Sequence, residues 1–166
     1  MPALEAGIQA PEIKLAALDG QKFSLQDALK RGPVVAAFFK VDCPVCQFTF
    51  PYLEKIFRAY GQSGKFTLVG ISQNDAADTR AFNREFGITF PILLDEKGKY
   101  PASNAYGLTN VPTVFRISTA GEVETSIVAW SKQDMEQLNE KLAHLSGKPA
   151  IKLFASGERV PDYKPG

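Results

Sequence analysis

The chain has 166 residues, a length that suits one domain with a core large enough to be stable without disulfide bonds. With 45% hydrophobic residues, 22% charged residues and a net charge of +1, it gives no electrostatic reason to expect nucleic acid or a membrane as a partner. Its longest apolar runs fall far short of the roughly 20 residues of a membrane-spanning helix, and residues 1–15 lack the regions of a signal peptide, so we expect a cytoplasmic protein.

The first predicted element is a β-hairpin over residues 12–24. Two short runs of alternating apolar and polar residues flank Asp19 and Gly20, a pair typical of a two-residue turn. Ser24 is a favourable helix cap and predicts a single helical turn over residues 24–29.

A strand and a helix are predicted next. Residues 34–41 are almost continuously apolar, which favours a strand buried on both faces of a sheet. Apolar residues then recur at helical spacing over 44–60 until Gly61, and Pro51 inside this run predicts a kink.

The remaining pattern continues the alternation of strands and helices. It predicts a strand over 66–72, a helix over 76–86, a strand over 90–95, a short helix or turn over 101–107, a hairpin of strands 111–118 and 122–130, and a helix between Ser131 and Gly147. This order predicts an α/β fold with a central mixed sheet and helices on both faces. We divide the chain into a domain over 1–147 and an extended or partly disordered tail over 148–166.

Cys43 and Cys46 are the only cysteines of the chain, and they lie in a C-x-x-C arrangement. A structural zinc site needs four ligands, usually Cys and His, whereas the chain adds only His144, far away in the sequence. A disulfide between residues this close removes little entropy from the unfolded chain, so it is a poor staple. Among strands and helices, the spacing is typical of a redox pair that opens and closes.

The residues around this pair resemble a known superfamily. FFKVDCPVCQFTFPYLEKI (38–56) resembles the active-site strand, loop and helix of the thioredoxin superfamily, and VPT (111–113) resembles its cis-proline segment. The combined motifs are similar to the AhpC/TSA and TlpA/ResA-like branch: APEIKLAALDGQKFSL, GISQND, FGITFPILLDEKG and YGLTNVPTVFRISTAGEV. The resemblance covers residues 8–146 and implies a thioredoxin-like fold with an N-terminal β-hairpin extension.

The chemistry of the pair follows from its predicted place. Cys43 at the start of a helix meets free N–H groups and the positive end of the helix dipole, which favour a nucleophilic thiolate. That thiolate can attack a substrate disulfide, and Cys46, one helical turn on, can resolve the mixed disulfide. The resemblance further implies that Pro112 follows a cis bond and packs beside Cys43, and that Val111 pairs with a substrate chain through its backbone.

We expect Pro44, Val45 and Thr113 to complete the substrate-binding surface. The sequence departs from better-known relatives at three places: Pro-Val lies between the cysteines, Ala37 replaces the buried acid of thioredoxins, and Asp42 replaces a tryptophan. The resemblance to the TlpA/ResA branch favours a reductant. No nucleotide or flavin motif appears, so we expect a monomer without a cofactor that takes electrons from another protein or a small thiol and reduces protein or small-molecule disulfides.

Two alternatives stay open. A peroxiredoxin-like thiol peroxidase needs a threonine where this chain has Lys40, as well as an arginine near its cysteine, and no motif surrounds Arg116. The second alternative is a non-enzymatic thioredoxin-fold module that senses redox state or binds Cu(I) through both cysteines, because soft thiolates suit that ion.

Overall fold

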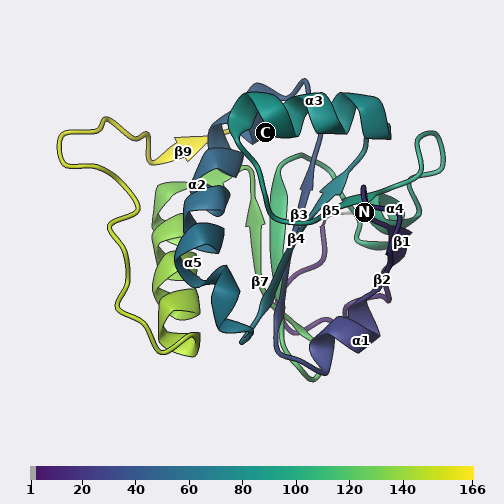
Figure 1. Cartoon of the computed structure of the whole chain (residues 1–166), viewed down its shortest axis with the longest axis horizontal. Helices are drawn as coiled ribbons and strands as arrows, with labels where there is room; N and C mark the ends of the chain where they lie inside the picture. Colours follow the sequence, from purple (N-terminus) through teal and green to yellow (C-terminus); the bar gives the residue numbers. More distant parts are fainter. Residues whose placement is uncertain (1–2) are drawn as a thin grey trace.

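A five-stranded sheet forms the centre of the computed structural model, which describes residues 3–166 (Figure 1). Its strands are β3 (Val34–Phe39), β4 (Thr67–Ser72), β5 (Ile92–Leu94), β6 (Thr113–Ile117) and β7 (Val123–Val128). They lie in the order β5-β4-β3-β6-β7, with β3, β4 and β5 parallel and with antiparallel pairing of β3 with β6 and of β6 with β7. The predicted mixed sheet is confirmed.

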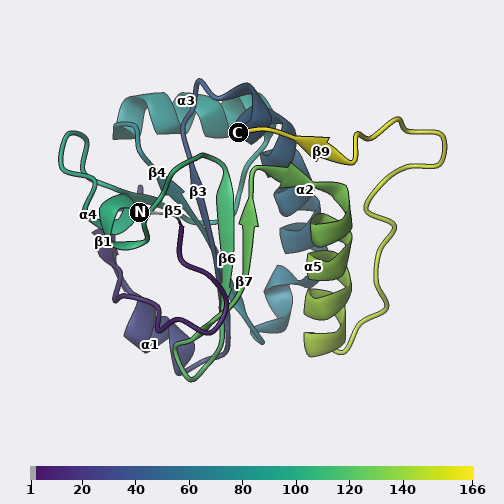
Figure 2. The same ribbon diagram turned by 180° about the vertical axis from the view of Figure 1, so that it is seen from behind.

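Helices cover both faces of this sheet, as predicted (Figures 1 and 2). One face packs against α2 (Pro44–Tyr60), α3 (Ala76–Phe86) and α5 (Lys132–Leu145). The other face packs against the predicted N-terminal hairpin of β1 (Lys14–Ala16) and β2 (Lys22–Ser24), together with α1 (Leu25–Leu29) and α4 (Pro101–Ala105). A 3-10 turn, η1 (Gly61–Ser63), follows α2. No helix within residues 3–166 is long and apolar enough to cross a membrane.

The central position of β3 in the sheet explains why all of its residues are apolar. Val35, Ala37 and Phe39 point into the core beneath α2, while the alternate residues of the strand join the core beneath α1. Since successive side chains of a strand point to opposite faces, a strand covered on both sides has no solvent-exposed position. All six residues of β3 are buried.

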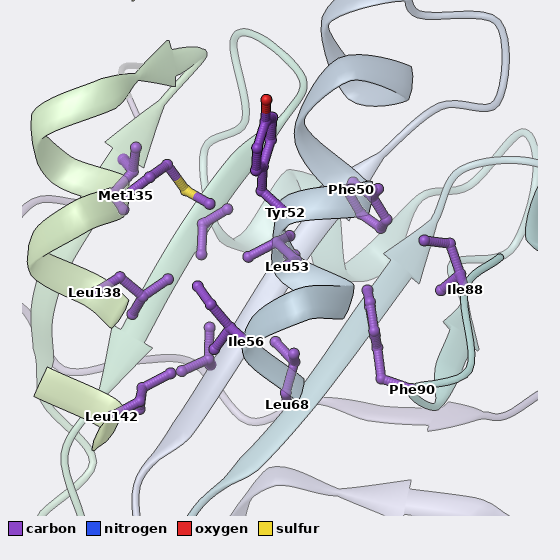
Figure 3. Close-up of a cluster of buried hydrophobic side chains, with 14 of the residues drawn as sticks. Phe50, Tyr52, Leu53, Ile56, Leu68, Ile88, Phe90, Met135, Leu138 and Leu142 are labelled. Atoms are coloured by element: carbon purple, nitrogen blue, oxygen red, sulfur yellow. The ribbon is translucent and has the colours of Figure 1, made fainter. Parts of the chain in front are cut away.

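The core beneath α2 and α5 positions the start of α2. Figure 3 shows Leu53 and Ile56 of α2 between the side chains of α5 on one side and those of Leu68 and Phe90 on the other. Met135, Leu138 and Leu142 recur along α5 at helical spacing and point toward α2. This packing fixes the position of α2 relative to α5 and the sheet, and it therefore also fixes the position of the loop that precedes α2.

One predicted strand is divided in the structure. The sequence predicted a continuous strand over residues 122–130, but β7 ends at Val128 and Trp130 begins the separate strand β8 (Trp130–Ser131). Ala129 lies between them with a φ of 66°. This left-handed conformation interrupts the ladder, so the backbone of Trp130 belongs to a separate two-stranded sheet.

The tail over residues 148–166 is largely extended and packs against the domain. It leaves the far end of α5, runs along the outside of the molecule and returns as β9 (Tyr163–Lys164), the yellow segment in Figures 1 and 2. There it pairs antiparallel with β8. Leu153 of the tail is buried in the core beneath α5 and α2, so this segment contributes to the packing.

Candidate active site

Cys43 occupies the N-cap of α2. Its backbone is extended there, and its Sγ accepts a hydrogen bond from the N–H of Cys46 at 3.2 Å. Pro44 follows in the first turn, where its missing N–H leaves no hydrogen bond unmade. The Cys43 side chain is half-buried, so its sulfur lies at the positive end of the helix dipole and is still accessible to solvent.

Cys46 lies one turn further along α2 and is completely buried. Burial is the main cause that raises the pKa of its thiol well above the usual range, and its hydrogen bond with Cys43 adds to this effect. Both cysteines are free thiols. The pair therefore holds one accessible sulfur and one shielded, protonated sulfur.

The loop before β6 lies directly against Cys43. The peptide bond between Val111 and Pro112 is cis. The Cys43 thiol donates to the carbonyl oxygen of Val111 at 3.4 Å, although the two residues are 68 positions apart. Thr113 is fully buried and its hydroxyl donates to the carbonyl of Asn110, so its side chain shapes this loop and has no surface to offer a substrate.

The other predicted site residues lie around the rim. Pro44 is exposed and Val45 is half-buried, so both border the surface beside the sulfur. Asp42 and Lys40, which precede the N-cap Cys43, are both exposed.

Buried carboxylates of the described residues serve the fold. Glu54 accepts hydrogen bonds from the backbone of Thr89 and Phe90 and from the Arg58 side chain, and Asp95 accepts from the start of α4. Ala37, at the place of the thioredoxin acid, is buried in the same core as Cys46. Residues 3–166 include no group of three His, Cys, Asp or Glu side chains arranged to hold a metal ion.

The end of the chain lies beside this site, which the sequence did not predict. A Cβ built on Gly166 would lie 2.6 Å from the Val111 carbonyl oxygen, the same oxygen that Cys43 contacts. The Lys164 ammonium also lies 5.2 Å from the ring centre of Phe48, a residue of α2. The tail has little periodicity, and its apolar Leu153 and Phe154 were the one signal that it packs on the domain.

Burial of Cys46 predicts a pH-dependent stability of the reduced protein. The unfolded chain loses the Cys46 proton above pH ~8.5, whereas the folded protein keeps it, so stability falls as pH rises. Between pH 9 and 10 we expect the free energy of unfolding to drop by about 1 kcal/mol more in the reduced wild type than in Cys46→Ala. Urea unfolding of both proteins across this range measures the difference. Equal pH slopes would contradict the burial of a protonated thiol.

Comparisons with known proteins agree with this arrangement. The model of the AhpC/TSA family matches residues 6–126. The chain is 31% identical over 137 residues to the thioredoxin-like protein YneN of Bacillus subtilis (strain 168), covering 81% of this chain and 78% of that relative. It is 30% identical over 141 residues to the thiol-disulfide oxidoreductase ResA of Geobacillus thermodenitrificans (strain NG80-2), covering 84% and 79%.

Comparison with a solved structure shows that the fold of this chain is also similar to that of a known protein. The thioredoxin domain of a thiol-disulfide oxidoreductase from Bacteroides vulgatus superposes with a TM-score of 0.73 at 25% identity, covering 84% of this chain and 98% of that domain. The predicted thioredoxin-like fold is thereby confirmed.

Proposed function

The chain belongs to the AhpC/TSA family, and from this premise we propose that it is a thiol-disulfide oxidoreductase that reduces disulfides through Cys43 and Cys46. Oxidoreductase activity is supported by the relatives named thiol-disulfide oxidoreductase and by the thioredoxin-like fold. The observation that carries the proposal is the unequal pair: Cys43 is accessible at a helix N-cap, and Cys46 is buried directly behind it.

The first step is attack by the Cys43 thiolate on one sulfur of the substrate disulfide. The new bond joins Cys43 Sγ to that sulfur, the substrate S–S bond breaks, and the second substrate sulfur leaves as a thiolate that takes up a proton. The Cys46 N–H, which donates to Cys43 Sγ, stabilises the negative charge before the attack.

The second step is resolution of the mixed disulfide. Cys46 gives up its proton to solvent and attacks Cys43 Sγ. The bond between Cys43 Sγ and the substrate sulfur breaks, that sulfur leaves as a thiolate and takes up a proton, and a Cys43–Cys46 disulfide remains. A dithiol donor, either another protein or a small thiol, then returns two electrons to the pair. Since Cys46 is buried and protonated, we propose that its deprotonation limits this step.

The environment of Cys46 supports the direction of the reaction. Thiol-disulfide oxidoreductases that act as oxidants have a stable reduced form, because one of their two cysteines is a stabilised thiolate. Burial of Cys46 disfavours its thiolate, so the reduced pair gains no stabilisation from ionisation of this sulfur. Ionisation of Cys46 therefore does not make the pair oxidising, which agrees with the proposed role as a reductant.

Equilibration in graded reduced and oxidised glutathione, followed by alkylation of the free thiols, tests this proposal. We expect a single two-electron transition near −250 mV or below, in the range of thioredoxin. A transition near −120 mV would make the protein an oxidant. Failure of Cys43 and Cys46 to form any disulfide would overturn the redox function itself.

A further inference from the structure

The end of the chain lies over the surface beside Cys43. Residues 163–166, which we call the C-terminal strap, include β9 and the two residues that follow it. Figures 1 and 2 show that the strap ends near the start of α2, on the opposite side of the molecule from the loop where the tail begins. The space beside the Gly166 Cα is bounded by Val111 and Asn110, so the strap lies next to the loop that contains the cis bond before Pro112.

Gly166 makes this close approach possible. Any side chain at this position would put its Cβ within 2.6 Å of the Val111 carbonyl oxygen and 3.3 Å of the Asn110 side chain. The first distance is closer than carbon and oxygen atoms tolerate, so only glycine lets the backbone lie this near another backbone. The backbone of the strap therefore lies close to the Val111 carbonyl, which is also the oxygen that Cys43 contacts.

The attachments of the strap are few. Tyr163 and Lys164 pair with the two residues of β8, and the Lys164 ammonium lies over the ring of Phe48 at 5.2 Å. Tyr163 is 62% exposed. A ladder of two residue pairs and one solvent-accessible cation–π contact hold a segment weakly, so the strap can leave its place without unfolding of the domain.

An extended polypeptide that pairs with the backbone of Val111 would need the position that the strap occupies. We infer that the C-terminal strap sets the substrate class of Cys43, so that small disulfides reach the sulfur directly while extended protein substrates must first displace the strap. This inference rests on the proposed function for its substrates. It follows that the observed rate with protein disulfides is the intrinsic rate multiplied by the fraction of molecules in which the strap is displaced.

Two variants are designed to remove this close approach and to keep the contacts that attach the rest of the tail. A chain that stops after Asp162 lacks the strap but retains the carbonyl of Pro161, which accepts from Trp130 Nε1, and the carbonyl of Asp162, which accepts from the Lys132 N–H. Gly166→Val keeps the whole chain but collides with Val111. Ser156→Val is the matched control, because it adds the same side chain at an exposed position of the same tail.

The single-turnover rate of each reduced protein is measured with insulin and with glutathione disulfide. We expect both strap variants to accelerate the reaction with insulin at least about threefold and to leave the reaction with glutathione disulfide within a factor of about 1.5. The Ser156→Val control should match the wild type with both substrates. Equal acceleration with both substrates, no change, or slower reaction with insulin would each overturn the inference.

Alkylation separates this inference from the proposed function. Cys43 is the accessible sulfur, so iodoacetamide and a maleimide carrying polyethylene glycol report its access without any redox turnover. We expect the strap variants to raise the rate with the bulky reagent relative to the small one. An unchanged ratio overturns the inference, whereas absence of disulfide exchange with every substrate overturns the proposed function and leaves the alkylation result valid.

Discussion

Replacement of Cys43 by serine is expected to reduce the rate of disulfide reduction by at least about a thousandfold, because a serine hydroxyl is not ionised at neutral pH and is a poor nucleophile toward sulfur. The side chain is half-buried at the N-cap of α2, and serine is itself a favourable cap, so the fold should be retained. Insulin reduction with dithiothreitol as the donor measures the loss, and circular dichroism checks the fold.

Cys46→Ser is the matched control for this prediction. It keeps the attacking sulfur but lacks the thiol that resolves the mixed disulfide, so we expect it to accumulate a covalent adduct with a disulfide substrate. Mass spectrometry of the non-reduced protein detects the adduct. If Cys46→Ser turned over normally, or if the adduct formed on Cys46 in Cys43→Ser, the assignment of the two roles would be wrong.

Trp130→Ala is expected to lower the free energy of unfolding by about 3–5 kcal/mol, the range for truncation of a large buried aromatic side chain. Trp130 is completely buried, and its ring lies 4.8 Å from Phe48, 5.2 Å from Tyr52 and 6.0 Å from Phe154, measured between ring centres. Its Nε1 donates to the carbonyl of Pro161 at 2.8 Å. The indole thus joins α2 to the tail. Urea unfolding of the wild type and of Trp130→Ala measures how much this side chain contributes to the free energy of unfolding.

Trp130→Phe separates the hydrogen bond from the packing. It keeps an aromatic ring but removes the donor, so we expect a smaller loss of about 1–2 kcal/mol. Trypsin provides a second readout, because Arg159 is exposed in the tail and should be cut faster once the tail loosens in Trp130→Ala. Unchanged cleavage together with a loss below about 1 kcal/mol would show that Trp130 does not anchor the tail.

Local signals in the sequence were sufficient for the elements around the active site. The helix predicted over 44–60 is α2 with the same bounds, because Pro44 at its start, the helical spacing of apolar residues and Gly61 at its end all act within a few residues. The capped turn after Ser24 was found for the same reason, since its hydroxyl accepts from the N–H of Asp27. The spacing of Cys43 and Cys46 on one helix is likewise a local property.

The tertiary structure alone decided which distant residues meet Cys43. Val111 lies beside it because β3 and β6 are neighbours in the sheet, which brings the end of one strand to the start of the other. The break at Ala129 and the partner of Trp130 depend on a tail with no periodicity of its own. Periodicity reports the local backbone, whereas contacts between segments far apart depend on how the whole core packs. The sequence by itself therefore determined the C-x-x-C spacing of the pair and the helix that carries it, and only the tertiary structure decided that the end of the chain lies near the Val111 carbonyl beside Cys43.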